Sequence, residues 1–536
     1  MSKTKDANTN GSQRLLDDDF KAVVEVTMER WKIPGMAIAV VDGGNTWAEG
    51  YGYAQLPDTP VTPDTLFYAG STTKAFTAAT LAMLVEDDES YPQVQWGTPV
   101  NQLIRDDFVL SNEWDTDNIT VEDILSHRTG MPRHEFAYGG DYDGHPATLQ
   151  DIVRSLRYLP RSAPPRTTFQ YCNVMFIVAS HLIESLTGDW LGNVFRQRIW
   201  DPLGMNMSFL SLQDAQDSGA ELAQGYCYND DADNPGFQKV PWKNKPEVSG
   251  AGAIISNVND YAKWAATSLR QNSRFYSPAG YSSIFTPRTL VPYQKPWSKP
   301  SAYALAWYTD VYNGVEIVWH DGGIDGFGAE IALIPSLDFA VITMANTTYS
   351  SNYAGTALVY HLIDNKLGLP STKRFDWNAY YEDLEAQMEA ALDNALETFY
   401  PSIPSPARPP SLPLALYIGH YCHPAYRRLS ILWDEEKGVL HASRPDSTTP
   451  CTLTFSPVSG DFFLVTVQIV GAKTVLPAEF RLGPDGTPSM VGIAWEPTLG
   501  DEKIWMVKED ERGSRRKKYL AGMPRGVIDP LHPIDF

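Results

Sequence analysis

Residues 68 to 87, "YAGSTTKAFTAATLAMLVED", form the stretch that indicates the fold most clearly. From Ala75 to Val85 it carries neither charge nor proline, and it ends in acidic residues, which predicts a helix. Apolar residues cover nearly every face, so we expect this helix to be buried inside a domain. Ser71 and Lys74 lie one turn apart at its start, on the same face. An unpaired ammonium is costly to bury, so Lys74 needs a partner or a chemical role.

The Ser-x-x-Lys spacing of Ser71 and Lys74 has two interpretations. It is a weak signal alone, because it also occurs at 2–5 and 514–517, near the charged chain ends. In the structural interpretation, Ser71 caps the helix and Lys74 reaches water. In the chemical one, desolvation makes a neutral, proton-accepting Lys74 accessible, and free N–H groups at the helix start serve an oxyanion.

Outward from this helix, the sequence predicts an α+β domain. Helical spacing over 20–31 is followed by two short strands, 36–42 and 46–54, around a Gly-Gly-Asn turn. Further helices are expected at 121–127, 148–159, 174–187, 259–269, 353–366 and 376–399. Long irregular stretches are expected at 131–147 and 212–248, and a run of strands at 303–346. This order predicts an antiparallel sheet built from both ends of the domain, flanked by helices, with an all-helical subregion between.

The composition then divides the chain into parts. Residues 1–15 are polar and expected to be disordered, and 16–399 form the α+β domain. The proline-rich segment 400–414 predicts a stiff linker. From 415 to 536, short alternating runs separated by Gly, Pro and Asp turns predict a small antiparallel β-barrel.

The totals exclude several classes of function. Among 536 residues, 43 Lys and Arg stand against 65 Asp and Glu, for a formal charge of −22. Such an acidic chain repels nucleic acid and anionic membranes, so neither is an expected partner. Four scattered cysteines without CxxC spacing argue against zinc and a disulfide scaffold, and we expect neither metal nor cofactor. Without an apolar signal-peptide core or a membrane-length run, the expected location is cytoplasmic, and the basic run 512–518 is expected to be an exposed tail.

Two later segments favour the chemical interpretation of Ser71. Tyr171 and Asn173, at i and i+2, project the same way from an extended turn, so one can move a proton while the other holds a substrate amide. His320-Asp-Gly-Gly323 ends a strand, where glycines allow a substrate to approach the backbone closely. Each segment alone also fits a packed turn.

In this order the three segments resemble the serine β-lactamase and penicillin-binding-protein superfamily. The likeness is greatest to its class C, family VIII esterase and D-aminopeptidase branches. It extends over roughly residues 20 to 370, with supporting phrases "ITVEDILSHRTGMP" (119–132) and "SGAGAIISNVNDYAKWA" (249–265). The resemblance implies a β-lactamase-like transpeptidase fold, and the segment from about 412 resembles the lipocalin-like domain of some relatives. The chain contains no GxSxG, which disfavours an α/β-hydrolase.

The resemblance also implies roles for individual residues. Ser71 would be the nucleophile, Lys74 its base, and Tyr171 the group that passes a proton to the leaving group. Which of Lys74 and Tyr171 accepts the first proton stays open. Substrate would be bound by Asn173 and by the strand residues His320, Gly322 and Gly323, with the N–H groups of Ser71 and Gly323 as the oxyanion hole.

The chain departs from the family at this strand. Where β-lactamases carry Lys-Thr/Ser-Gly, His320-Asp321-Gly322 stands here, and a neutral imidazole beside a carboxylate is a poor anchor for a substrate carboxylate. We therefore expect neither antibiotic resistance nor cell-wall synthesis. Aromatic residues of the two long loops are expected to shape the pocket, although each could simply pin its loop: Phe136, Tyr138, Tyr142, Tyr226 and Trp242.

The leading hypothesis is a serine hydrolase that cleaves an ester, lactone or amide bond of a small molecule or short peptide through an acyl-enzyme. An acyltransferase using the same acyl-enzyme, which would pass it to an alcohol or amine, is the alternative. A non-catalytic binding protein is the third hypothesis, disfavoured because Ser71, Lys74, Tyr171 and Asn173 are all present. The oligomeric state is open, with a homodimer as one option.

Overall fold

The computed structural model of the chain describes residues 15–142, 144–230, 235–270, 277–292, 296–297 and 300–509. Almost all of the start expected to be disordered, and the basic run 512–518, lie outside the described residues. The chain divides into two compact units. The first contains the residues up to Asp393 with the short segments Asp446–Thr449 and Ile469–Ala472, and the second contains the remainder from Asn394.

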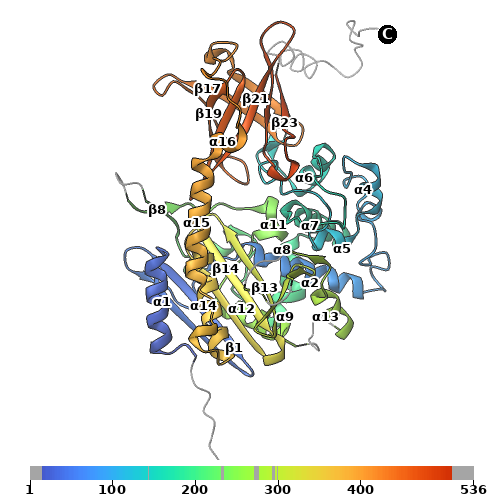
Figure 1. Cartoon of the computed structure of the whole chain (residues 1–536). Coiled ribbons are helices and arrows are strands. Elements are labelled where there is room, and N and C mark those ends of the chain that lie inside the picture. Colours follow the sequence, from blue (N-terminus) through green and yellow to red (C-terminus); the bar gives the residue numbers. More distant parts are fainter. Residues whose placement is uncertain are drawn as a thin grey trace, which may run out of the picture. The chain divides into compact units, whose positions relative to one another are not determined.

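An antiparallel sheet, which has nine strands in the described part of the chain, is the centre of the first unit (Figure 1). Its order is β10-β11-β12-β13-β14-β15-β1-β2-β3. The strands are β1 Gly35–Asp42, β2 Asn45–Gln55, β3 Thr59–Pro60, β10 Thr289–Leu290, β11 Ala302–Tyr303, β12 Tyr308–Tyr312, β13 Val315–Ile324, β14 Phe327–Ile334 and β15 Phe339–Ala345. β1 pairs with β15 in the register Val40 to Val341, so both ends of the domain build the sheet, as the sequence predicted.

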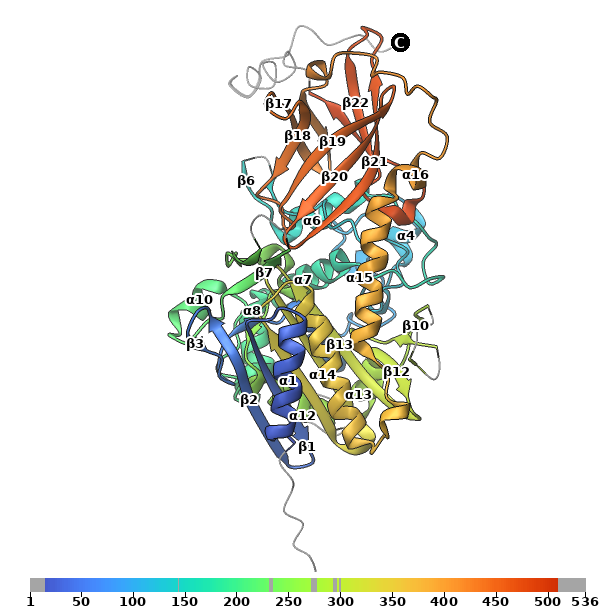
Figure 2. The same ribbon diagram turned by 60° about the vertical axis from the view of Figure 1, so that its left-hand side comes forward.

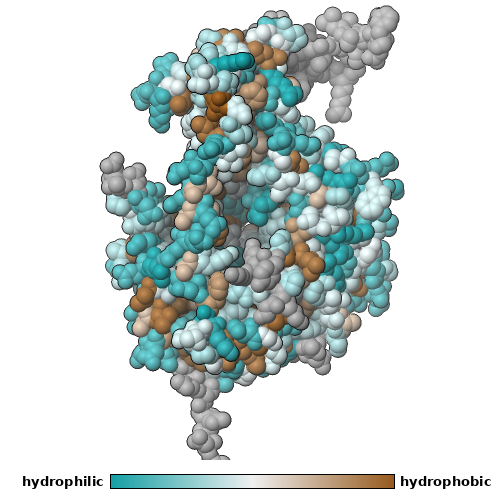
Figure 3. All heavy atoms as spheres, in the orientation of Figure 1, coloured by the Kyte–Doolittle hydropathy of each residue, from teal (hydrophilic) through white to brown (hydrophobic). Residues whose placement is uncertain are grey.

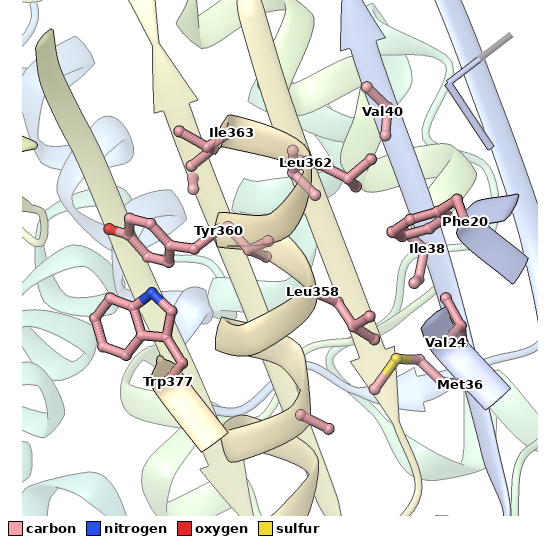
Figure 4. Close-up of a cluster of buried hydrophobic side chains, with 14 of the residues drawn as sticks. Phe20, Val24, Met36, Ile38, Val40, Leu358, Tyr360, Leu362, Ile363 and Trp377 are labelled. Atoms are coloured by element: carbon pink, nitrogen blue, oxygen red, sulfur yellow. The ribbon is translucent and has the colours of Figure 1, made fainter. Parts of the chain in front are cut away.

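Helices α1 (Asp18–Arg30) and α14 (Ser350–Lys366) pack on one face of this sheet (Figure 2). The side chain of Asp17 caps α1 by accepting the Phe20 N–H at 3.0 Å. Apolar side chains of both helices meet those of β1 in a buried cluster (Figure 4), which includes Phe20, Val24, Ile38, Val40, Leu358 and Leu362. Each such side chain contributes about 1.5–3 kcal/mol by leaving water, so this cluster fixes the sheet and its helices as one core.

Helix α15 (Trp377–Asp393) buries only its first residue, Trp377, and its other residues are exposed or half-buried. The face of the molecule in Figure 3 is mostly hydrophilic, with apolar side chains in small, scattered groups.

No helix in the described ranges is long and apolar enough to cross a membrane.

The helical subregion surrounds α2 (Thr73–Glu86), the helix predicted from residues 68–87. All but three of its residues are buried, and Phe76 stacks on Trp264 with ring centroids 4.4 Å apart. The other helices expected between residues 121 and 269 are α5 Val121–Leu125, α6 Leu149–Ser155, α7 Asn173–Thr187 and α12 Val258–Ser268. The apolar pattern thus placed both the central helix and its neighbours.

Short elements connect these helices. Three are 3₁₀ helices, labelled η: η1 Gly70–Thr72, η2 Leu156–Tyr158 and η4 Pro246–Val248. Others are the short helices α3 Val100–Leu103, α4 Glu113–Asn118, α8 Leu191–Phe195, α9 Asp201–Leu203, α11 Ser249–Gly252 and α13 Pro278–Phe285. Two strand pairs also occur here: β4 Phe67–Tyr68 with β9 Ile255–Ser256, and β5 Asp141–Tyr142 with β6 His145–Pro146.

The prediction that 212–248 is irregular was wrong. This stretch contains α10 (Leu212–Asp217) and a hairpin of β7 (Gly225–Asn229) and β8 (Gly236–Val240). Backbone bonds from outside the hairpin hold β7: Tyr226 donates to the Asn346 carbonyl, and Thr348 donates to that of Tyr226. These partners lie about 120 residues away in the sequence, so the local pattern could not reveal them.

The second unit is a closed eight-stranded antiparallel barrel. Its strands are β16 Gly419–His423, β17 Arg427–Asp434, β18 Val439–Arg444, β19 Cys451–Ser459, β20 Phe462–Ile469, β21 Ala472–Leu482, β22 Pro488–Ile493 and β23 Ile504–Lys508. Burial alternates along β19, where Leu453 and Phe455 point inward, and closure leaves no free sheet edge. Helix α16 (Ala395–Phe399) and the segment 400–414 also belong to this unit, and Ser411 Oγ donates to Asp461 at 2.7 Å.

Glu330 on β14 gives the first unit a testable pH dependence. Its side chain is buried and accepts a hydrogen bond from Thr356 Oγ1 at 2.7 Å, and burial raises its pKa to about 8. The folded protein therefore holds a proton that the unfolded chain releases near pH 4.5, so the free energy of unfolding falls as pH rises through this window. Between about pH 6 and about pH 9, we expect the free energy of unfolding of the parent to fall by roughly 2–3 kcal/mol more than that of Glu330→Gln. Chemical denaturation at each pH measures both values. Glu316→Gln, which changes an exposed glutamate, is the control. If the free energy of unfolding depended on pH in the same way in the parent, Glu330→Gln and Glu316→Gln, Glu330 would not be a buried, protonated carboxyl.

Candidate functional site

Ser71 lies in η1, the turn that leads directly into α2. Ser71 is not the capping residue of either element, because Ala69 precedes η1 and Thr72 precedes α2, and Lys74 is fully buried. The interpretation of Ser71 as an ordinary helix cap with Lys74 in water is therefore wrong. Ser71 Oγ and Lys74 Nζ lie 2.8 Å apart, within hydrogen-bond distance.

The surroundings of Lys74 favour its neutral form. Burial, followed by the charge of Arg133, lowers the pKa of Lys74 well below its ordinary value. Its Nζ donates to the Ala251 carbonyl at 2.6 Å, and the rings of Tyr171 and Phe176 lie 5.0 and 5.3 Å away. The Ala251 carbonyl and the two aromatic rings thus hold the amine next to Ser71.

Tyr171 and Asn173 stand at the start of α7, beside Ser71. Tyr171 and Ser71 share a side-chain hydrogen bond, while burial raises the pKa of the phenol. Tyr171 therefore stays protonated, whereas Lys74 is disposed to accept a proton.

His127 holds the Tyr171 segment in place. Its carbonyl accepts the Gln170 N–H at 2.8 Å, its Nδ1 accepts the Cys172 N–H at 3.0 Å, and its ring centroid lies 4.2 Å from that of Tyr171. Burial lowers the pKa of His127, so the neutral ring carries its proton on Nε2, which is buried without a hydrogen-bond partner among the described residues. His127 also has a φ of 53°, an uncommon backbone conformation for a non-glycine residue.

Glycines allow β13 to pack directly against the Ser71 turn. A Cβ on Gly322 would lie 2.1 Å from the Ala69 oxygen and 2.9 Å from the Ser71 nitrogen. Gly70 has a φ of +53°, and a Cβ there would lie 2.7 Å from the Gly323 nitrogen. The backbone nitrogens of Ser71 and Gly323 are thereby brought to one place, where two N–H groups can stabilise an oxyanion.

The structure places His320 differently from the substrate-facing position expected from the sequence. Its side chain is fully buried, with Nε2 3.0 Å from the Tyr303 hydroxyl and Nδ1 2.5 Å from the Asp321 carbonyl oxygen. Burial, with a smaller effect of Lys74, lowers the pKa of His320 to about 3, so the imidazole is neutral. His320 thus supports the wall of the site and is not part of its surface.

A cavity of about 520 Å³ opens at Ser71, and all of its lining residues belong to the first unit. Tyr171, Asn173, Gly323 and Tyr138, which are among the site residues expected from the sequence, line it. Gly322 lies behind this surface, and Phe136 and Trp242 do not line the cavity. Trp242 instead donates its Nε1–H to the Ala223 carbonyl at 2.9 Å and packs on Tyr68 and Phe327.

The cavity is also lined by charged residues, of which the sequence analysis named only Asp321. Arg133 Nε donates to Glu135 Oε1 at 3.0 Å, and Asn173 Nδ2 donates to the same oxygen at 2.8 Å. Lys245 pairs with Asp325 at 3.2 Å, and Asp321 lines the wall at β13. Arg133 and Glu135 occur within residues 131–147, so charged residues beside the "SHRTGMP" phrase were the available signal.

This arrangement has the parts needed for acyl transfer: a hydroxyl next to a buried amine whose pKa is lowered, a phenol whose pKa is raised, and two N–H groups for an oxyanion. In the described part of the chain, no group of three or more His, Cys, Asp or Glu side chains could hold a metal ion.

Comparison with known proteins identifies the family of the chain. The Beta-lactamase family model matches residues 20–364, and a model named domain of unknown function (DUF3471) matches residues 404–508. The chain is 67% identical over 541 residues, covering 100% of both proteins, to unguisins hydrolase ungD' of Aspergillus campestris. It is 54% identical over 520 residues, covering 93% of this chain and 92% of the relative, to unguisins hydrolase ungD of Aspergillus violaceofuscus.

Among solved structures, the octameric penicillin-binding protein homologue from Pyrococcus abyssi has a TM-score of 0.58 at 19% identity, covering 91% of this chain and 99% of that one. At this identity the likeness shows the fold alone. The superfamily resemblance drawn from three short segments is confirmed by the family model and by the relatives aligned over the whole length. The chain belongs to the beta-lactamase family of serine hydrolases.

Proposed function

We propose that the protein hydrolyses an ester, lactone or amide bond of unguisins, or of a closely similar small molecule or short peptide, through an acyl-enzyme on Ser71. The observation that carries this proposal is the 2.8 Å contact between Ser71 Oγ and the buried Lys74 amine. The 67% identity to a hydrolase of unguisins supports the choice of substrate.

In the acylation step, Ser71 Oγ attacks the substrate carbonyl carbon while Lys74 Nζ takes the hydroxyl proton. The carbonyl oxygen becomes an oxyanion held by the N–H groups of Ser71 and Gly323. The carbon then releases its nitrogen or oxygen substituent, which receives a proton through Tyr171, and Tyr171 is reprotonated from Lys74. An ester links the acyl group to Ser71, and Lys74 is neutral again.

In the deacylation step, water takes the place of the leaving group. Lys74 accepts a proton from the water as its oxygen attacks the acyl carbon, and the bond to Ser71 Oγ breaks. Ser71 recovers its proton, and the acid product leaves. An alcohol or amine in place of this water would make the protein an acyltransferase.

Product analysis in H₂¹⁸O tests the proposal. We expect purified protein to convert unguisins to products that gain one water, with one ¹⁸O in the new carboxyl group, and Ser71→Ala protein to form none. A product joined to an added alcohol or amine, without ¹⁸O, would indicate acyl transfer instead. Unguisins left intact by a folded protein that hydrolyses simple esters would contradict the proposed substrate.

A further inference from the structure

The charged side chains that line the cavity form ion pairs with one another, except for Asp321. Arg133 pairs with Glu135, and Lys245 pairs with Asp325 and donates to the Thr448 carbonyl at 2.7 Å. Asp321 forms no ion pair with a Lys or Arg among the described residues; burial raises the pKa of its carboxyl, and the charges of Lys74 and Arg133 lower it by smaller amounts. His320 Nδ1 lies 3.9 Å from an Asp321 carboxylate oxygen, but burial lowers the pKa of this imidazole to about 3, so it carries no charge.

Asp321 is also positioned to meet a substrate. Its side chain is 48% exposed and lines the cavity. It precedes Gly323 by two residues on β13, so both project toward the same side of the strand. Asp321 and Tyr171 line the same cavity, and the charge of Asp321 acts on both Tyr171 and Lys74. A leaving group that receives a proton through Tyr171 therefore emerges near Asp321.

We propose that Asp321 is a specificity-determining residue that selects the leaving group. Its carboxylate accepts hydrogen bonds from N–H groups on the leaving side of the scissile bond, and it repels a carboxylate there. The substrate class is therefore an acyl compound whose leaving part is neutral or cationic, such as an internal amide or a blocked peptide end, and chains ending in a free carboxylate next to the bond are excluded. This inference rests on the proposed function, because it assumes a leaving group at Ser71.

Like charges in a partly desolvated cavity repel more strongly than in water, because the local dielectric is lower. Neither Arg133 nor Lys245 offsets this repulsion fully, since each already has a carboxylate partner. We expect the resulting discrimination to be about tenfold or more in kcat/KM and to weaken at high ionic strength.

Two matched esters measure this effect: 4-acetoxybenzamide and 4-acetoxybenzoate, whose leaving groups differ in one charge. The value of kcat/KM for each ester is divided by its rate of hydroxide hydrolysis, which removes the difference in intrinsic reactivity. We expect the parent protein to favour the benzamide about tenfold, and Asp321→Ser to bring the ratio close to one. Serine is chosen over asparagine because an Asn-Gly pair deamidates, and Asp321→Ala is the second variant should the first not fold.

Glu316→Gln is the matched control, because it removes one exposed negative charge at the other end of the same strand. We expect it to keep the parental ratio. The same ratio in the parent and both Asp321 variants, with turnover still lost in Ser71→Ala, would overturn the role of Asp321 alone. Turnover that persists in Ser71→Ala would instead overturn the proposed function, and with it this inference.

Discussion

Ser71→Ala is expected to abolish both covalent labelling and turnover, whereas Lys74→Ala is expected to slow them. Removing the Ser71 hydroxyl leaves no atom to carry the acyl group. Removing the Lys74 amine leaves the hydroxyl without its proton acceptor 2.8 Å away, and general-base contributions are typically about 10²–10⁴-fold. The two residues act as one unit, so the double variant should be little worse than Ser71→Ala. Rates of labelling by a fluorophosphonate and of ester turnover measure both effects.

Thr77→Ala is the control for these variants. Thr77 lies on the same face of α2, one turn beyond Lys74, and its Oγ1 donates to the Gly250 carbonyl at 2.7 Å. This substitution disturbs the packing of α2 on α11 without touching Ser71, so we expect a loss of about 1 kcal/mol in stability and near-parental labelling. A similar rate loss in Thr77→Ala and Lys74→Ala would mean that Lys74 acts through packing and not as a base.

Tyr171→Phe is expected to impair cleavage of amides far more than cleavage of activated esters. An amine leaves poorly unless it is protonated, so loss of the Tyr171 hydroxyl should lower kcat for an amide about 10²–10⁴-fold. A 4-nitrophenolate leaves without a proton, so the same variant should lose much less on a 4-nitrophenyl ester. The measurement is kcat for an amide and an ester that carry the same acyl group.

Tyr261→Phe controls for the loss of a buried phenol near the site. Its hydroxyl lies 2.9 Å from Thr72 Oγ1, one residue after Ser71, and Tyr261 does not line the cavity. We expect Tyr261→Phe to lower stability slightly and to affect amide and ester alike. Equal losses on amide and ester in Tyr171→Phe would contradict proton delivery to the leaving group.

Much of the fold was available from the sequence, because its strongest signals are periodic. The charge-free run from Ala75 to Val85 predicted a buried helix, and alternating residues after 415 predicted the barrel. The hairpin of 225–240 was missed because its first strand is held by residues after β15, a contact that no local pattern contains. Its composition, rich in Asn, Asp and Gly around the turn, resembles that of an irregular loop.

The positions of site residues were predictable where these residues are close together in the sequence. They were not predictable where the path of a long loop brings a residue to the cavity. Ser71 and Lys74 are three residues apart in one continuous helical segment, and Tyr171 stands two residues before Asn173, the first residue of α7, so local geometry sets their relation. Arg133 and Glu135 reach the cavity through a long loop whose path depends on tertiary contacts. On β13, Asp321 lines the cavity and His320 is buried, because neighbouring residues of a strand point to opposite sides.

Intact-mass analysis of trapped protein tests the central claim, that Ser71 carries the acyl group, most directly. The protein is quenched in acid during turnover of a slow ester and digested to locate the adduct. We expect one added acyl group per chain, on the peptide containing Ser71, present in the parent and absent from Ser71→Ala. An adduct on any other residue, or full turnover by purified Ser71→Ala, would contradict it.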